Sequence, residues 1–281
     1  MSKRKSKLIK SLIITASVIA FLGLVLLFFV IGENYASEFE RVTPSYDKVD
    51  LNPILAKDTL SDEDYATVYA QTGLTRIGYE DMLKEYGKDG ILELQEAFFK
   101  EYGIHSYNFA PFCYYHTVKG KMPMVPLKNG DIIVSSSTEF SWWSVGHCAM
   151  VVDAENGVIV EAIGVGDDST YGYTSALSKR GDFIVLRPNI DEAALDKIVD
   201  YVNTELIGIP YDPTIGVLSR KYNEEIPYTQ CAHIFWFAFF KHGFDIDSNG
   251  GSVVTPKDIS NSKYFDIVQV SGFDLESLWS D

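Results

Sequence analysis

The residues from Leu12 to Ile31 form a run without a single charged side chain, and this run constrains the chain most. Twenty helical residues span about 30 Å, the thickness of the hydrocarbon core of a bilayer. A cleaved signal peptide is the alternative, but its apolar region is usually about 7–15 residues long. Residues 32–37 also lack a clear small-x-small cleavage site. We therefore expect an uncleaved transmembrane helix within residues 1–32.

Charge predicts the orientation of this helix. Five basic residues precede the apolar run, and no acidic residue occurs before Glu33. Basic residues stay in the cytoplasm, so the chain after Glu33 should face outward at the cell membrane as a single-pass protein. That part has all 39 Asp and Glu with 19 of the 24 Lys and Arg, a formal charge near −20. Such a charge repels nucleic acid and anionic lipid surfaces, and we expect neither as a partner.

Cysteine and histidine usage argues against metal or disulfide scaffolds. The three cysteines are Cys113, Cys148 and Cys231, and no C-x-x-C pair occurs. The five histidines show no zinc-binding spacing, so we expect no metal site and no cofactor. An odd cysteine count leaves at least one free thiol, although a disulfide between Cys113 and Cys148 stays open.

The outward part divides into three predicted segments. Residues 33–58 are polar with two prolines and are predicted to be a linker, and residues 59–110 a small helical accessory segment. There Ser61 is a helix N-cap, and further helices are expected from Tyr79 and from Ile91. Residues 111–281 should form the catalytic domain.

The pattern of residues 111–281 predicts an α+β domain, with an antiparallel sheet packed against helices. Short apolar runs bounded by turns indicate strands, and longer amphipathic stretches indicate helices that do not alternate regularly with them. The expected strands are Ile132–Val134, His147–Val152, Val158–Ile163, Asp182–Leu186 and Phe265–Val270, and the expected helices are Asp191–Leu206 and Gln230–His242.

Cys231 is the predicted nucleophile because it lies in the first turn of the last expected helix, with Thr229 as the proposed N-cap. Free N–H groups and the positive end of the helix dipole favour a thiolate there and can donate to an oxyanion. A small buried core residue is the alternative for Cys231, and helix position alone does not decide between them.

His147 and Glu161 are predicted to support Cys231, because they fall on one face of an expected hairpin. If the turn over residues 153–157 places Ala149 opposite Glu161, then His147 lies diagonally from Glu161. In a tighter register His147 faces Glu161 directly. A carboxylate beside an imidazole orients it and stabilises the imidazolium. Cys148 points to the opposite face and is interpreted as a core residue.

Other candidates carry weaker signals. Tyr211 precedes the Cys231 helix and is predicted to line the substrate cleft, although a structural tyrosine is as good an interpretation. Trp142 and Trp143 either wall this cleft or cap the core. The remaining histidines have no carboxylate at a defined strand offset or lie on the wrong helix face, and we expect structural roles for His105, His116, His233 and His242.

Taken in order, these motifs resemble the circularly permuted branch of the NlpC/P60 papain-like superfamily, in particular the YiiX/YycO-like hydrolases. The resemblance covers about residues 60–275 and is carried by Leu127–Ile133, Gly146–Val152, Val158–Ala162, Ile209–Asp212, Tyr228–Cys231 and Val254–Ile259. It implies a papain-like fold with Cys231 as nucleophile, His147 as base and Glu161 as orienting acid. The family often has Cys-Ser-Glu at the helix start, where this chain has Cys231-Ala232-His233.

Three functions follow as expectations. The first is a membrane-anchored extracytoplasmic cysteine hydrolase that cleaves an amide bond, in peptidoglycan peptides, through a thioester. The second is a lipid or acyl ester hydrolase or acyltransferase of the same fold, with residues 107–116 lining an acyl pocket. The third is a non-catalytic cell-surface binding module.

Overall fold

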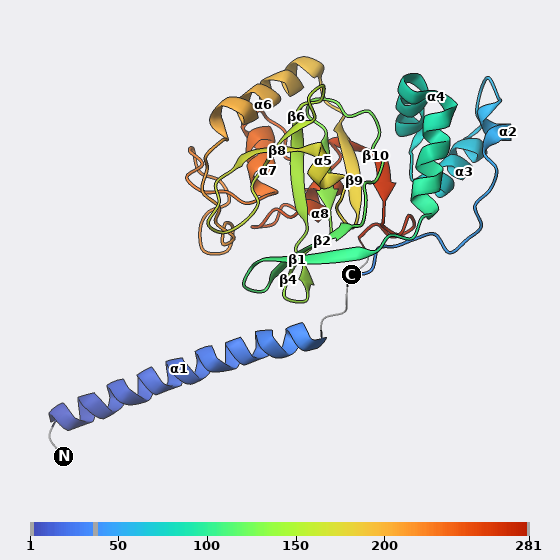
Figure 1. The fold of residues 1–281 in the computed structure, drawn as a ribbon. Coiled ribbons are helices and arrows are strands. Elements are labelled where there is room, and N and C mark those ends of the chain that lie inside the picture. The colour runs from blue at the N-terminus through green and yellow to red at the C-terminus, as the bar shows by residue number, and fades with distance from the viewer. Residues whose placement is uncertain (1–2, 36–38, 280–281) are drawn as a thin grey trace.

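A long N-terminal helix and a folded body make up the protein (Figure 1). The computed structural model describes residues 3–35 and 39–279. Helix α1 (Lys3–Tyr35) stands away from the body, and its stretch Ile9–Gly32 is long and apolar enough to cross a membrane. Its end approaches the side of the body on which β1 and β4 lie (Figure 1). Length and composition fit both a membrane span and a signal sequence.

A six-stranded antiparallel sheet forms the centre of the body, which confirms the predicted α+β class. Its order is β10-β9-β3-β6-β7-β8. The strands are β3 (Ile132–Ser135), β6 (His147–Asp153), β7 (Val158–Glu161), β8 (Thr170–Tyr173), β9 (Phe183–Pro188) and β10 (Phe265–Ser271). Every predicted strand is present with its ends within two residues of the prediction, and β8 is an addition at the edge.

The sheet buries both faces, because its side chains alternate between two hydrophobic clusters. Cys148 and Met150 pack on one face with α6 (Glu192–Glu205) and α7 (His233–Lys241). Ala149 and Val151 pack on the other face with the N-terminal helices. Those helices are α2 (Asn52–Leu55), α3 (Asp62–Thr72) and α4 (Arg76–Phe99), and two short helices, α5 (Thr174–Leu177) and α8 (Pro256–Ser260), complete the body.

The helical accessory segment begins as predicted. Ser61 caps α3 in a capping box with Asp64, and the helix ends at Gly73 in the left-handed conformation. The two helices expected from Tyr79 and from Ile91 are one element, α4, which is kinked at Gly87. Gly87 has a φ of 66°, a conformation that costs a side-chain-bearing residue more than glycine.

A second, four-stranded sheet was not predicted. Its order is β1-β2-β4-β5, formed by β1 (Ile104–Ala110), β2 (Cys113–Val118), β4 (Thr138–Phe140) and β5 (Trp143–Ser144). The hairpin β1–β2 crosses the predicted boundary at residue 110. Its side chains are mostly exposed or half-buried, so no alternation of buried and polar residues marks it in the sequence.

The predicted linker contacts the body at several points from residue 39 onward. Phe39 stacks on His116 with ring centroids 4.8 Å apart, and the N–H of Val42 donates to the carbonyl of Gly272. Leu51 is wholly buried in the cluster beneath the sheet. Residues 39–58 are therefore part of the body.

Candidate functional site

Strands β6 and β7 bring His147 beside Glu161. Met150 pairs with Val160, and the register shifts at a bulge after Val151, so the looser of the two predicted registers is the one formed. His147 is then diagonal to Glu161, and its Nε2 lies 2.8 Å from Glu161 Oε2. Both residues are at least nine-tenths buried, so water does not screen this contact.

Cys231 lies directly before α7. The helix begins at His233 with Ala232 as its N-cap, so the expected start at Gln230 and the expected Thr229 cap are wrong. The first helical backbone bond still runs from the N–H of Ile234 to the carbonyl of Gln230. Cys231 is therefore inside the first hydrogen-bonded turn, at the positive end of the helix dipole.

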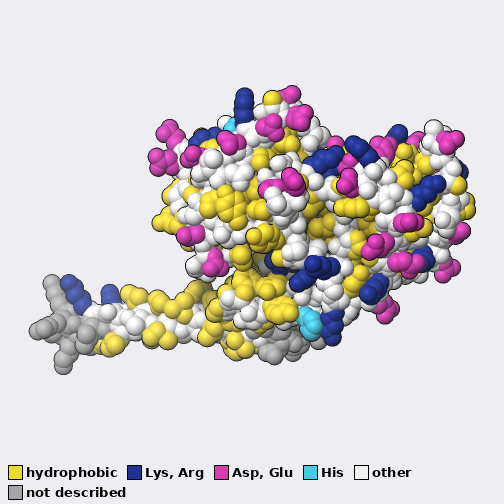
Figure 2. Space-filling view, turned by 45° about the horizontal axis from the view of Figure 1, so that its top comes forward, with side chains coloured by type: hydrophobic (Ala, Val, Ile, Leu, Met, Phe, Trp, Pro, Cys, Tyr) yellow, Lys and Arg dark blue, Asp and Glu magenta, His cyan; other side chains and the backbone are white. Residues whose placement is uncertain are grey.

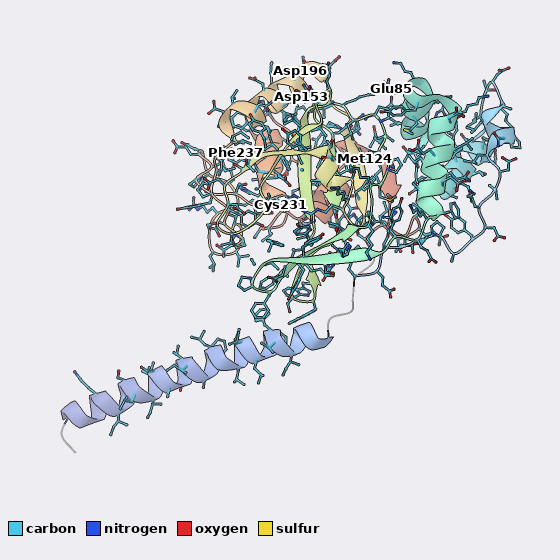
Figure 3. All side chains as sticks on the ribbon, viewed as in Figure 1. Glu85, Met124, Asp153, Asp196, Cys231 and Phe237 are labelled. Carbon is cyan, nitrogen blue, oxygen red and sulfur yellow. The ribbon has the colours of Figure 1, made fainter. Side chains whose placement is uncertain are left out.

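Two neighbouring residues of β6 act electrostatically on the Cys231 side chain. One is Cys148, whose thiol donates to the backbone oxygen of Cys231 over 3.2 Å. The other is the imidazole of His147. Since Nε2 of His147 faces Glu161, Nδ1 is the nitrogen left for the sulfur. Cys231 and Asp153 lie at opposite ends of β6 (Figure 3), so the site is at the N-terminal end of this strand.

The electrostatics of these contacts favour an ion pair. Hydrogen bonds from Cys148 and His147 lower the pKa of Cys231 well below its usual value, against the opposing effect of burial. Burial lowers the pKa of His147, but the bonds to Cys231 and Glu161 outweigh it and raise that pKa. Burial likewise raises the pKa of Glu161, and the bond to His147 outweighs it and lowers it. Thiolate, imidazolium and carboxylate are therefore the favoured forms near neutral pH.

The Gln230 side chain accepts from one of the backbone N–H groups that we expected to stabilise an oxyanion. The N–H of Ala232 donates to Gln230 Oε1 over 3.0 Å, and the Gln230 amide nitrogen donates to the Val254 carbonyl over 2.6 Å. The Gln230 amide is thus fixed beside the sulfur, and Ala232 can reach an oxyanion only after this bond opens.

A cavity of about 1070 Å³ opens at the site. Its volume is at the upper end of ligand pockets, which hold about 300–1,000 Å³. Cys231 and His147 lie in its wall, together with the half-buried Tyr211 and the 67% exposed Trp143. The rest of the wall is mainly apolar and aromatic, and includes Phe39, Phe109, Phe140, Val145, Ile163, Val165, Phe273 and Trp279.

Tyr211 lies in the wall of the same cavity as Cys231. Burial, and next the charge of Cys231, raise the pKa of this phenol, so it stays protonated. Its backbone pairs with Thr229 in a parallel bridge that ties the segment to the turn before Cys231. A protonated hydroxyl can donate to a bound carbonyl oxygen.

The sequence did not reveal three charged or polar groups near the site. His116 is buried with Nε2 3.1 Å from Glu139 Oε2, at ion-pair distance without hydrogen-bond geometry, so its expected lack of a carboxylate is wrong. Arg180 interacts electrostatically with Glu161 and stacks on a tyrosine ring. Asp182 is buried in the cavity wall, accepts bonds from Ser136, and has its pKa raised by burial. All three depend on strand pairings that leave no local pattern.

The remaining cysteines make no disulfide, and both His233 and His242 bond to backbone carbonyls. Cys113, Cys148 and Cys231 are all free thiols, so the open disulfide between Cys113 and Cys148 is not formed. Within residues 3–35 and 39–279, no group of three or more His, Cys, Asp or Glu side chains is arranged to hold a metal ion. His233 donates to the carbonyl of Lys221 and is a core residue.

Comparison with known proteins finds one partial structural similarity. No model of a protein family matches the chain, and no curated protein is similar to it. The crystal structure of the metalloprotein yiiX from Escherichia coli O157:H7 superimposes with a TM-score of 0.41 at 15% sequence identity. The match covers 52% of this chain and 98% of that one. The chemistry of the site is therefore argued from its own residues.

Proposed function

We propose that the protein is a cysteine hydrolase with Cys231 as nucleophile, His147 as general acid and base, and Glu161 as the orienting carboxylate. The observation that carries this proposal is the buried hydrogen bond between His147 and Glu161 beside the low-pKa thiol of Cys231, in the wall of a cavity large enough for a substrate. A nucleophile, a base in contact with it and a third group orienting the base are the parts of such a mechanism.

The reaction uses these groups in two steps. The Cys231 thiolate attacks the substrate carbonyl carbon, and His147 gives its proton to the leaving nitrogen or oxygen, which leaves an acyl thioester. His147, now neutral, takes a proton from water, and the resulting hydroxide attacks the thioester carbon. The carboxylic acid departs and the thiolate–imidazolium pair is restored. Glu161 keeps its negative charge throughout and stabilises the imidazolium.

We further propose that α1 anchors the enzyme in the cell membrane with the catalytic body outside. The apolar span Ile9–Gly32 and the basic residues before it support this orientation. An amide bond in a peptidoglycan peptide is then one substrate within reach, and it is the first candidate.

An acyl substrate is the second candidate, and the cavity favours it. Cell-wall peptides are polar and charged, whereas the wall of this cavity is mainly aromatic and aliphatic. Apolar ligands gain roughly 25 cal/mol per Å² of apolar surface that leaves water, so such a wall selects for a fatty acyl chain. The bond cleaved would be a thioester, ester or amide of that acyl group.

Alkylation of the full chain in detergent tests the nucleophile. We expect iodoacetamide at neutral pH to modify Cys231 first, and Cys231→Ala to remove the fast reaction while Cys113→Ala keeps it. Burial raises the pKa of Cys113, so this residue is the matched slow thiol. A Cys231 that stays unmodified at neutral pH would contradict the mechanism.

Substrate trials separate the remaining functions. Release of free fatty acid from acyl lipids, lost in Cys231→Ala, would establish the second candidate, and release of amino groups from muropeptides would establish the first. If wild type and Cys231→Ala behave identically on both substrate types although the thiol is reactive, a binding module is the better description.

A further inference from the structure

The end of α1 is seated on an aromatic surface of the small sheet. We define the aromatic tip as Phe112, Phe140, Trp142 and Trp143, which lie in or directly beside the turns β1–β2 and β4–β5. Phe28 packs edge-on against Trp142 at 5.1 Å between centroids. Phe29 lies 5.9 Å from Trp142, 5.8 Å from Phe112 and 5.5 Å from Phe140.

The contacts give the depth of the aromatic tip relative to α1. The apolar span of α1 ends at Gly32, and Phe28 and Phe29 precede it by four and three residues. At 1.5 Å per residue, both rings lie about 5–6 Å inside the outer end of the span. A Cβ on Gly32 would come within 1.9 Å of the Trp142 ring, so glycine permits this close approach. Trp142 therefore lies level with the last apolar turn of the helix.

The backbone of the aromatic tip is strained in a way that holds this arrangement. Phe112 and Ser141 are the non-glycine residues with positive φ, at 63° and 56°, among the residues described. They meet each other, since the N–H of Ser141 donates to the carbonyl of Phe112 over 2.6 Å. The Ser141 hydroxyl is buried without a hydrogen-bond partner. Strain of this kind persists where function requires a fixed local geometry.

Charge is missing from this part of an otherwise acidic protein. Residues 104–118 contain no Asp, Glu, Lys or Arg, and residues 136–146 contain only Glu139. Hydrophobic side chains gather where α1 meets the body, while acidic side chains are spread over the surface further away (Figure 2). The net charge that repels anionic lipids is thus kept away from the aromatic tip.

We propose that the aromatic tip inserts into the outer interface of the bilayer beside α1, as a second membrane contact. Trp rings prefer this level, where the apolar ring meets lipid and the indole N–H meets the headgroups. The inference rests on the proposed anchoring by α1, because the depth is measured along that helix. It places the catalytic cavity at the membrane surface, since Phe140 and Trp143 belong to both the aromatic tip and the cavity wall.

Quenching of tryptophan fluorescence by brominated lipid tests the inference. The full chain is reconstituted into phosphatidylcholine vesicles with bromines placed either near the headgroups or deep in the acyl chains. We expect stronger quenching by the shallow bromines than by the deep ones. The double variant Trp142→Phe with Trp143→Phe should lose most of this quenching. The matched variant Trp236→Phe should keep it, because Trp236 is 3% exposed in the core.

A substitution in α1 tests the seating without changing the aromatic tip. Gly32→Leu puts a side chain into the space of Trp142, whereas nothing lies within 4 Å of a Cβ on Gly23. We expect Gly32→Leu to weaken the shallow quenching and Gly23→Leu to leave it unchanged. Equal quenching in wild type and the double tryptophan variant would overturn the inference.

The same vesicles separate this inference from the anchoring on which it rests. If the protein resists alkaline extraction but brominated lipid does not quench Trp142 and Trp143, the insertion of the aromatic tip is contradicted and the anchoring by α1 is not. A protein that alkaline buffer releases contradicts the anchor itself.

Discussion

The ionisation of Cys231 depends on two different neighbours on strand β6. The Cys148 thiol, which donates to the Cys231 carbonyl, and the His147 imidazole both lower the pKa of Cys231. Burial keeps the pKa of Cys148 well above its usual value, so Cys148 stays a donor while Cys231 is a thiolate. The chemistry of a single sulfur is thus decided by adjacent residues that point to opposite faces of the strand.

Glu161→Gln should raise the pKa of Cys231 and lower that of His147. The amide oxygen can still accept from His147, but the charge that stabilises the imidazolium is gone. We expect the pH midpoint of iodoacetamide labelling to move up by about one unit. The rate of labelling between pH 4 and pH 10 measures it, and an unmoved midpoint would show that Glu161 does not act on the pair.

Cys148→Ala should also raise the pKa of Cys231, because the strongest donor to the thiolate is removed. Cys148→Ser keeps a donor of similar size and should restore much of the low midpoint. The same labelling series compares both variants. If Cys148→Ser and Cys148→Ala give the same pH midpoint of labelling, a hydrogen bond from residue 148 does not set the pKa of Cys231.

At the scale of single elements, helix α8 supports the cavity through its cap. Thr255 accepts from the N–H of Asp258 and bonds to the Asp258 carboxylate in a capping box, and Thr255 and Pro256 line the cavity. Thr255→Ala should lower the free energy of unfolding by about 1 kcal/mol, and Thr255→Ser by much less. Urea unfolding of both variants measures the difference. Equal losses would mean that the hydroxyl is not a cap.

Helix α7 should make stability depend on pH through His233. Burial lowers the pKa of His233 to about 4, from 6.5 in the unfolded chain. As the pH is lowered below 6.5, His233 is protonated first in the unfolded state, so the free energy of unfolding decreases. The decrease ends near pH 4, where His233 in the folded state also binds the proton. The total loss is about 3 kcal/mol for this group. His233→Gln should flatten that part of the stability curve, and an unchanged slope would contradict the assignment.

Elements differed in how well local pattern predicted them. The strand that carries His147 was found because its residues are apolar on both faces, and α3 because Ser61 caps it. The small sheet was missed because its strands are short, aromatic and largely exposed. Helix α7 begins three residues later than expected, because the Gln230 side chain, not a Thr229 cap, satisfies the N–H of Ala232.

The whole molecule combines an apolar N-terminal helix with an acidic body. If α1 is an uncleaved anchor, the protein should remain in the membrane fraction after an alkaline wash, with its full mass of 31.5 kDa. Protease added outside intact spheroplasts should then digest the body. A smaller mass, equal to that of a chain that begins after the apolar run, would identify residues 1–32 as part of a cleaved signal peptide.

Four features followed from the sequence alone: the apolar span, the acidic character of the chain after it, the α+β class, and the placement of His147 and Glu161 on one sheet face. These follow from local periodicity and composition, which neighbouring residues in the chain specify. Only the tertiary structure decided between the two hairpin registers, put the Cys148 thiol on Cys231, and paired His116 with Glu139. It also built the cavity and seated the aromatic tip on α1. Those features join residues from distant parts of the chain, and such contacts depend on strand pairing and packing, which no local pattern encodes.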